Sequence, residues 1–196
     1  MKNVNYFLQG ETSKMKNIRN YILFSIAIFT FSFVNVTAQN FSSNQSARIV
    51  EREVFKEINK LPYYGVFDHI AFSYNNGTVN LYGKVANALN KKGAERSVRD
   101  IQGVTNVVNN IEILPLGSFD NSIRSRTLRE FASRGLYRYL WETDPSVRII
   151  VDRGHVTLEG YVANRGDYNL MNILANGVPG TFSVQNNLIV GNDRLR

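Results

Sequence analysis

The sequence predicts an α+β fold in which two tandem αββαβ domains each form a small mixed three-stranded sheet with two helices on one face. The first observation is an internal repeat, because the segment Gly77–Asn87 recurs as Gly154–Asn164 at an offset of 77 residues. The second is the order of patterns within each copy: helical spacing, strand alternation and turn residues follow one another in the same way. The third is the composition, since 43% hydrophobic and 20% charged residues are typical of globular domains and exclude a disordered or collagen-like chain.

The repeat continues through most of both copies without a gap. The same offset pairs Gly103 with Gly180. Self-similarity at a fixed offset indicates a duplicated structural unit. We therefore expect domain 1 over residues 47–115 and domain 2 over residues 119–191. The positions that carry the shared structural motif are Gly77, Val79, Leu81, Gly83, Val85, Gly103 and Asn109 in the first copy, and Gly154, Val156, Leu158, Gly160, Val162, Gly180 and Asn186 in the second.

The first copy begins with an amphipathic helix and a β-hairpin. Apolar residues recur at helical spacing until Pro62, which ends the helix. Alternating apolar residues then predict two strands, 70–74 and 79–85. Between them, Asn75–Gly77 favours the positive φ angles of a tight hairpin turn. In the second copy, Asp152–Gly154 occupies the corresponding turn.

The rest of each copy is a second helix followed by a last strand. We expect the helix over residues 88–101 and 165–176, and the strand over residues 104–113 and 182–190. Because the helix joins the second strand to the third, the right-handed crossover rule predicts that these two strands are parallel. The two hairpin strands are antiparallel.

A glycine lies inside the second strand of each copy, at Gly83 and Gly160. Glycine weakens a strand interior and often marks a place where another part of the chain approaches closely. We expect a helix to cross the sheet at these two positions.

The N-terminus has the three parts of a secretory signal peptide. A basic segment at residues 15–20 precedes an apolar stretch, Tyr21–Val34, and small residues end at Ala38. We expect residues 1–38 to be removed by cleavage after about Ala38; Met15 is an alternative start, which would place residues 1–14 upstream of the protein. An uncleaved anchor is the other interpretation, but an apolar core of about 14 residues is shorter than the roughly 20 that span a bilayer. Cleavage would place the mature chain outside the cytoplasm.

The charge of the chain depends on this cleavage. The net charge is +7, and removal of residues 1–38 takes away four basic residues and one acidic residue, which leaves +4. Because DNA and RNA are not the usual ligands outside the cytoplasm, we expect no nucleic-acid partner despite the sequence pI of about 9.7.

Catalytic and metal-binding patterns are missing from the sequence. There is no cysteine, which excludes disulfides, thiolate metal sites and a lipid-modified cysteine, so we do not expect a lipoprotein. The two histidines, His69 and His155, lie far apart in the chain, and no nucleophile-elbow, Walker or His-Glu-x-x-His motif occurs. We expect no enzymatic activity, no metal and no cofactor.

The duplicated motif Gly-x-Val-x-Leu-x-Gly-x-Val, followed by Gly103 to Asn109 and Gly180 to Asn186, resembles the BON domain, the module named for bacterial osmotically inducible and nodulation proteins. The chain departs from the family pattern at Thr181, where valine is usual. The resemblance implies a non-enzymatic periplasmic protein with two BON domains, associated with phospholipid membranes, envelope maintenance, osmotic stress or chaperone-like activity. In that family, a helix of the second domain faces anionic lipid.

One segment of this sequence suits such a surface. We expect Ile123–Trp141 to form a helix in which apolar residues gather on one side and arginine with aromatic residues on the other, although Arg129 falls on the apolar side. Guanidinium groups hold phosphate, and aromatic rings favour the membrane–water boundary. We expect peripheral contact with anionic phospholipid. The candidate lipid-binding residues are Arg124, Arg134, Tyr137, Arg138 and Trp141. The other interpretation is a solvated arginine face with Trp141 packed between the domains.

Two further groups of residues have open interpretations. Tyr63, Tyr64 and Phe67 would form the surface of a protein-interaction or chaperone-like module that binds envelope proteins, or they belong to the core. Asn109 and Asn186 recur at one position of the last strand, where an amide contacts a ligand or, when buried, satisfies loop backbone groups.

Overall fold

The computed structural model describes residues 45–140 and 144–191. The chain divides into Met1–Arg48 and one compact unit, Ile49–Arg196, which contains both copies of the repeat. The expected signal peptide and Trp141 lie outside the described residues.

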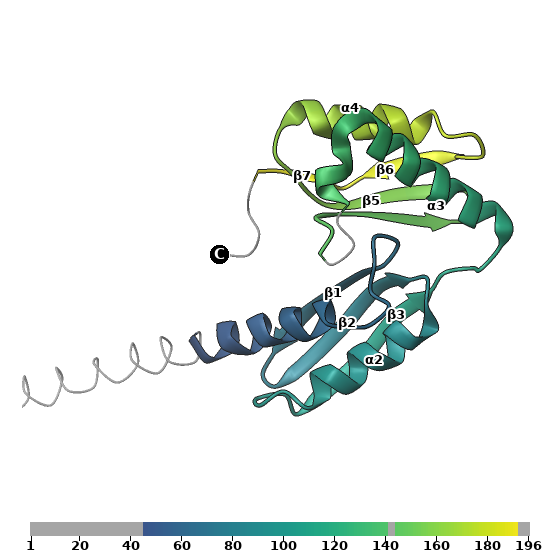
Figure 1. Cartoon of the computed structure of the whole chain (residues 1–196). Coiled ribbons are helices and arrows are strands. Elements are labelled where there is room, and N and C mark those ends of the chain that lie inside the picture. The colour runs from purple at the N-terminus through teal and green to yellow at the C-terminus, as the bar shows by residue number, and fades with distance from the viewer. Residues whose placement is uncertain (1–44, 141–143, 192–196) are drawn as a thin grey trace, which may run out of the picture. The chain divides into compact units, whose positions relative to one another are not determined.

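Domain 1 has the expected order of elements. A helix covers residues 45–59, and β1 (His69–Asn75), β2 (Thr78–Val85), α2 (Ala88–Arg99) and β3 (Asn106–Ile113) follow. The sheet order is β1-β2-β3, with β1 antiparallel and β3 parallel to β2. Both helices contribute to one core against the sheet, as Figure 1 shows for α2. Its fully buried members include Val54, Val79, Leu81, Val85, Ala94 and Val98.

Domain 2 repeats this order. Its elements are α3 (Ser118–Phe131), β4 (Val147–Asp152), β5 (His155–Val162), α4 (Arg165–Asn176), β6 (Ser183–Asn186) and β7 (Ile189–Val190). Strand β5 pairs with β4 in the antiparallel direction and with β6 and β7 in the parallel direction. Helices α3 and α4 cover the same face of this sheet (Figure 1). The predicted α+β fold of two tandem domains is confirmed.

The last strand of domain 2 is not continuous, in contrast to the single strand expected over residues 182–190. It divides into β6 and β7, which pair with β5 in one register, Leu158 with Asn186 and Tyr161 with Ile189. The amide of Asn187, just after β6, donates to the carbonyl of Leu158, and the amide of Gly191, just after β7, donates to the carbonyl of Val162. Both segments are therefore hydrogen-bonded to β5. β6 and β7 therefore occupy the place of one strand.

Both hairpin turns have the expected backbone. Asn76 and Gly77 have φ angles of 46° and 81°, and Arg153 and Gly154 have φ angles of 50° and 81°. Two consecutive positive φ angles match the twist of the flanking strands.

The expected reason for Gly83 and Gly160 is wrong. The atoms nearest to an added Cβ belong to the neighbouring backbone and not to a helix: the φ angles are +116° and +114°, and the Cβ would overlap the carbonyl oxygen of His69 or Ser146. Glycine is required by the conformation and by the approach of the adjacent segment.

The continuous helix expected over Ile123–Trp141 is also wrong. Helix α3 ends at Phe131, and Ala132–Leu136 (η1) forms a wide turn in which Gly135 has a φ angle of 79°. A short 3₁₀ helix, Tyr137–Tyr139 (η2), follows. A glycine with positive φ is a common helix stop, so residues before and after Gly135 do not share a helical face.

Candidate functional site

The structure changes the candidate lipid-binding set, beginning with Arg124. This residue was expected at the border of an exposed face, but it is only 2% exposed. Its Nη2 donates to the carbonyl of Val151 (2.6 Å) and its Nη1 to Oδ1 of Asn121 (2.6 Å). The expectation is wrong because these acceptors, one of them on β4, hold the guanidinium inside domain 2.

The next three candidates are exposed, although they do not share one helix face. Arg134 is exposed in η1, Tyr137 is 53% exposed, and the side chain of Arg138 is 55% exposed. Arg138 is not a free cation, because its Nη2 lies 2.5 Å from Oδ2 of Asp167. Its guanidinium also lies 4.7 Å from the ring centroid of Tyr139.

Further exposed arginines lie on the helices that flank this turn. Arg126 and Arg129 are exposed on α3, and Arg165 is exposed at the start of α4, over the ring of Tyr168 at 4.3 Å. Sequence analysis placed Arg129 on the apolar side of the expected helix Ile123–Trp141, but this residue is exposed to solvent. We call the following set the arginine surface: Arg126, Arg129, Arg134, Arg138 and Arg165. The acidic side chains of α3, the turn after it and the start of α4 are the buried Asp120, the exposed Glu130 and the largely buried Asp167.

Asp167 fastens the turn after α3 to the start of α4. Its Oδ2 accepts hydrogen bonds from Arg138, from the hydroxyl of Tyr139 (2.5 Å) and from Nδ2 of Asn164 (2.8 Å). The Tyr139 hydroxyl in turn accepts from the amide of Ala163 (3.0 Å). Although burial acts to raise the pKa of Asp167, the hydrogen bonds from Tyr139 and Arg138 hold that pKa below its usual value. The carboxylate is therefore a structural anchor for this surface.

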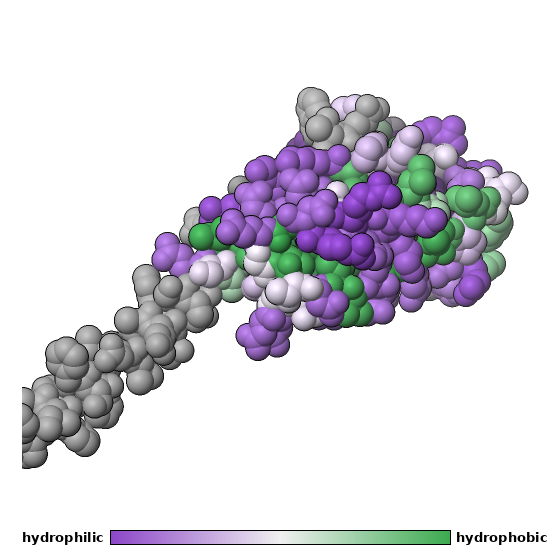
Figure 2. Space-filling view, turned by 90° about the horizontal axis from the view of Figure 1, so that it is seen from below, coloured by the Kyte–Doolittle hydropathy of each residue, from purple (hydrophilic) through white to green (hydrophobic). Residues whose placement is uncertain are grey.

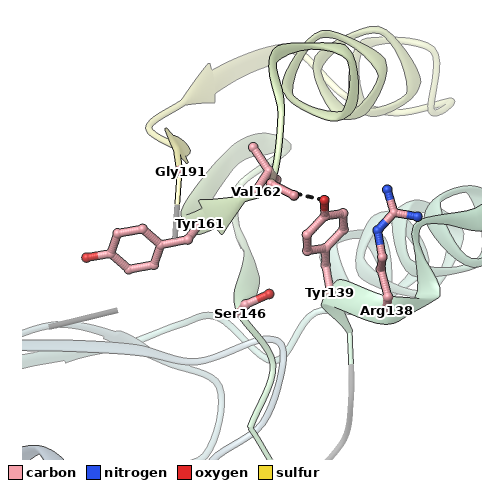
Figure 3. Close-up of a pocket in the computed structure, with 7 residues that line it drawn as sticks. Arg138, Tyr139, Ser146, Tyr161, Val162 and Gly191 are labelled. Atoms are coloured by element: carbon pink, nitrogen blue, oxygen red, sulfur yellow. Dashed lines mark hydrogen bonds between the residues drawn. The ribbon is translucent and has the colours of Figure 1, made fainter. Parts of the chain in front are cut away.

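A pocket of about 140 Å³ lies beside this anchor and is shown in Figure 3. Its lining residues are Arg138, Tyr139, Ser146, Tyr161, Val162, Ala163 and Gly191. The Tyr139 hydroxyl is directed toward the chain at Val162, whereas the ring of Tyr161 points away from Tyr139 (Figure 3). Ser146 is among the lining residues, but none of those described is a carboxylate or an imidazole that could serve as its base.

Metal ligands do not gather in the part of the chain that the structure describes: no three His, Cys, Asp or Glu side chains lie close enough together to hold an ion. His69 belongs to domain 1 and His155 to domain 2, where its Nδ1 lies 2.7 Å from Oγ of Ser183.

Asn109 and Asn186 have structural contacts. Nδ2 of Asn109 donates to the carbonyl of Lys91 on α2 (2.9 Å), and Oδ1 accepts from the amide of Ile111 (3.2 Å). Asn186 makes the equivalent bonds to Tyr168 and Leu188, each 77 residues further along. The amides tie the last strand to the second helix in both domains, which supports the structural interpretation.

Replacing Asn109 by alanine should therefore destabilise the fold by about 1–2 kcal/mol, because its hydrogen bonds are lost and its partners are left partly buried. Asn110→Ala is the matched control: this neighbour is exposed, and a change within about 0.5 kcal/mol is expected. Urea unfolding followed by circular dichroism measures both. Equal losses for the two variants would contradict the role assigned to the Asn109 amide.

The aromatic residues near the end of the first helix have unequal exposure. Tyr63 is 57% exposed, whereas Tyr64 and Phe67 are half-buried. The guanidinium of Arg148 lies 4.2 Å from the ring centroid of Tyr64, and Phe67 packs against the core of domain 2. Two of the three residues thus belong to the contact between the domains, which sequence analysis did not distinguish from a binding surface.

An exposed pair of phenylalanines was missed by sequence analysis. Phe119 on α3 is 49% exposed and Phe182 is 69% exposed, with ring centroids 5.7 Å apart. Thr105 stands at the repeat position equivalent to Phe182, and both donate their amide to the glycine of the hairpin turn. The shared backbone therefore does not require an aromatic residue there. On the face shown in Figure 2, hydrophobic residues form separate areas among hydrophilic ones. Single apolar residues on a protein surface are common and need no functional explanation.

Comparison with known proteins is consistent with the repeat. The sequence profile of the BON domain matches residues 46–115 and again residues 120–192. A comparison with curated proteins gave no match.

Among solved structures, two of CdsD, a structural protein of the type III secretion system of Chlamydia trachomatis, are similar at 12% identity and a TM-score of 0.30. The matches cover 71% of this chain and 90% and 96% of the CdsD chains, the second of which is the C-terminal domain.

The family also bears on location and activity. BON domain proteins are typically periplasmic or envelope-associated, and BON domains are not known as enzymatic domains. Across residues 45–140 and 144–191, none of the helices has the length and apolar character needed to cross a bilayer. With two matches that together span most of its length, the chain belongs to the BON domain family and carries two BON domains in tandem.

Proposed function

We propose that the protein is a non-enzymatic periplasmic module of the cell envelope and that its second BON domain binds anionic phospholipid membranes through the arginine surface. The observation that carries the proposal is the charge of this surface. Five exposed guanidinium groups lie on α3, the turn after it and the start of α4, whereas of the three carboxylates on these elements Asp120 is buried, Asp167 is bound by Arg138 and Glu130 is exposed.

The chemistry of these groups suits a lipid headgroup layer. Guanidinium groups form paired hydrogen bonds with phosphate oxygens. Each basic residue near an anionic bilayer contributes about 1 kcal/mol, and salt screens this attraction. The binding is therefore weak, reversible and salt-sensitive. Tyrosine rings favour the membrane–water boundary, so the exposed Tyr137 next to Arg138 supports the same surface.

Co-sedimentation with phosphatidylcholine vesicles, with and without phosphatidylglycerol, tests the proposal. Arg126→Glu/Arg134→Glu should weaken binding to the anionic vesicles by about tenfold or more, because two attractions become repulsions. High salt should weaken wild-type binding in the same direction.

The matched control is Lys92→Glu/Arg96→Glu, which makes the same charge change at exposed positions on α2 of domain 1. This variant should keep most of the wild-type binding. An equal loss in both variants would show attraction by overall charge alone, and unchanged binding of Arg126→Glu/Arg134→Glu would remove the arginine surface from the proposal.

A protein-interaction or chaperone-like function is the second candidate, and it rests on Tyr63, Tyr64 and Phe67. Domain 2 covers two of these residues. These two residues could bind a partner only if the domains moved apart. The arginine surface is already exposed, which supports the lipid proposal over this candidate.

A further inference from the structure

Strand β4 of domain 2 is buried more completely than the equivalent strand β1 of domain 1. Five of its six residues are buried, whereas only one residue of the equivalent strand, β1, is buried. Helices α3 and α4 cover the side of β4 that holds Val147, Ile149 and Val151. Arg148 and Ile150 alternate with these residues and are also buried, at 7% and 5% exposure. A second layer must therefore cover the other side of β4.

Residues of domain 1 provide contacts to that strand. The amide of Ile149 donates to the carbonyl of Val66 (2.7 Å), so the edge of β4 is paired. Nη1 of Arg148 donates to the carbonyl of Gly65 (2.8 Å). The guanidinium of Arg148 also lies over the ring of Tyr64, and Phe67 packs against the core of domain 2.

Charged side chains lie beside these contacts. Nζ of Lys84 on β2 is 2.6 Å from Oδ2 of Asp152 on β4 and 3.5 Å from Oε2 of Glu112 on β3. His69 on β1 is the register partner of Lys84, and Glu159 on β5 is the register partner of Arg148. His69 thus lies on β1 opposite the lysine that pairs with Asp152 of domain 2, and it is close enough to Arg148 and Glu159 of domain 2 for their charges to act on it.

We propose that the contact between the two domains is a pH-controlled latch, which is closed while His69 is neutral and opens when His69 is protonated. Opening uncovers apolar side chains that the closed state covers, chiefly Tyr64, Phe67 and Ile150.

The direction of the pH effect follows from the surroundings of His69. Burial lowers the pKa of His69 and the neighbouring Arg148 lowers it further, while Glu159 acts in the opposite direction. In the open state, His69 is hydrated and has its ordinary pKa of about 6.5. As the pH falls below that value, the open state binds the proton first, and the closed state loses stability.

The ion pair of Lys84 with Asp152 does not titrate in this range. The hydrogen bond from Lys84 holds the pKa of Asp152 below its usual value, and the same contact raises the pKa of Lys84. Both groups stay charged while His69 changes its charge.

Small-angle X-ray scattering of the purified protein, taken from about pH 7.5 to about pH 5, tests the latch. The radius of gyration should rise on acidification, and fluorescence of a hydrophobic dye should rise several-fold, with unchanged far-ultraviolet circular dichroism. His69→Gln should stay compact throughout. His155→Gln, at the exposed histidine of domain 2, should open as the wild type does. A wild type that stays compact, or a His69→Gln variant that opens equally, would overturn the proposal.

A measurement on the wild type avoids any folding defect of the variant. Nuclear magnetic resonance should give a titration midpoint for the His69 imidazole that lies below about 6.5 and coincides with the expansion. An expansion that follows a different midpoint from His69 would equally overturn the latch.

Discussion

Gly160→Ala is expected to destabilise the fold by about 3 kcal/mol or more. The φ angle of +114° at Gly160 is one that residues with a side chain rarely adopt, and the new Cβ would overlap the carbonyl oxygen of Ser146. That carbonyl accepts a hydrogen bond from the amide of Tyr161 (2.8 Å), so it cannot move away without loss of the bond. Urea unfolding followed by circular dichroism measures the effect.

Two further variants make this measurement specific. Gly83→Ala should behave in the same way in domain 1, because Gly83 has a φ angle of +116° and faces the carbonyl of His69. Gly117→Ala is the control: Gly117 has a φ angle of −72° and nothing lies within 4 Å of its added Cβ, so a loss of at most about 1 kcal/mol is expected. A loss for Gly160→Ala no larger than for Gly117→Ala would contradict the stated role of the backbone.

The same glycines show what the sequence can and cannot predict about the fold. The repeat, the turns at Asn76–Gly77 and Arg153–Gly154 and the strand directions are local or topological features, and they were predicted correctly. The position of Gly160 was also recognised as special. The reason why glycine is needed there was not predicted, because the carbonyl of Ser146 comes close to Gly160 only when the strands pair.

The long-helix error has a signal that the sequence does contain. Gly135 ends the helical region, but apolar residues resume beyond it at Leu136 and Tyr139, and the spacing alone makes the two segments look continuous. Giving the glycine more weight than the periodicity would have ended the helix correctly.

The site was less predictable than the fold. Arg124 is held by a carbonyl on β4, and Arg138 by a carboxylate on α4, so their exposure depends on contacts distant in sequence. Arg148 is different, because the consecutive apolar residues that follow it, Ile149–Val151, are typical of a strand buried on both sides. That pattern could have indicated that domain 2 needs a second covering layer.

Arg148→Ala is expected to weaken the contact between the domains by about 2–3 kcal/mol. The substitution removes the hydrogen bond to the carbonyl of Gly65 and the contact with Tyr64, and it leaves a partly buried carbonyl without this donor. The substitution also removes a cation that lowers the pKa of His69, so that pKa should rise toward its ordinary value. Unfolding by urea, scattering at neutral pH and the imidazole titration measure the three effects.

Two controls separate these effects from a general loss of charge. Arg126→Ala removes an exposed arginine of the same domain, and it should change stability by no more than about 0.5 kcal/mol. Arg148→Lys keeps the charge but loses the planar group that stacks on Tyr64, so the pKa of His69 should stay low while part of the stability is lost. Domain 1 carries Ala71 at the repeat position of Arg148, so the fold that the two domains share does not require arginine there. If Arg148→Ala costs no more than Arg126→Ala and leaves the scattering unchanged, Arg148 does not hold the two domains together.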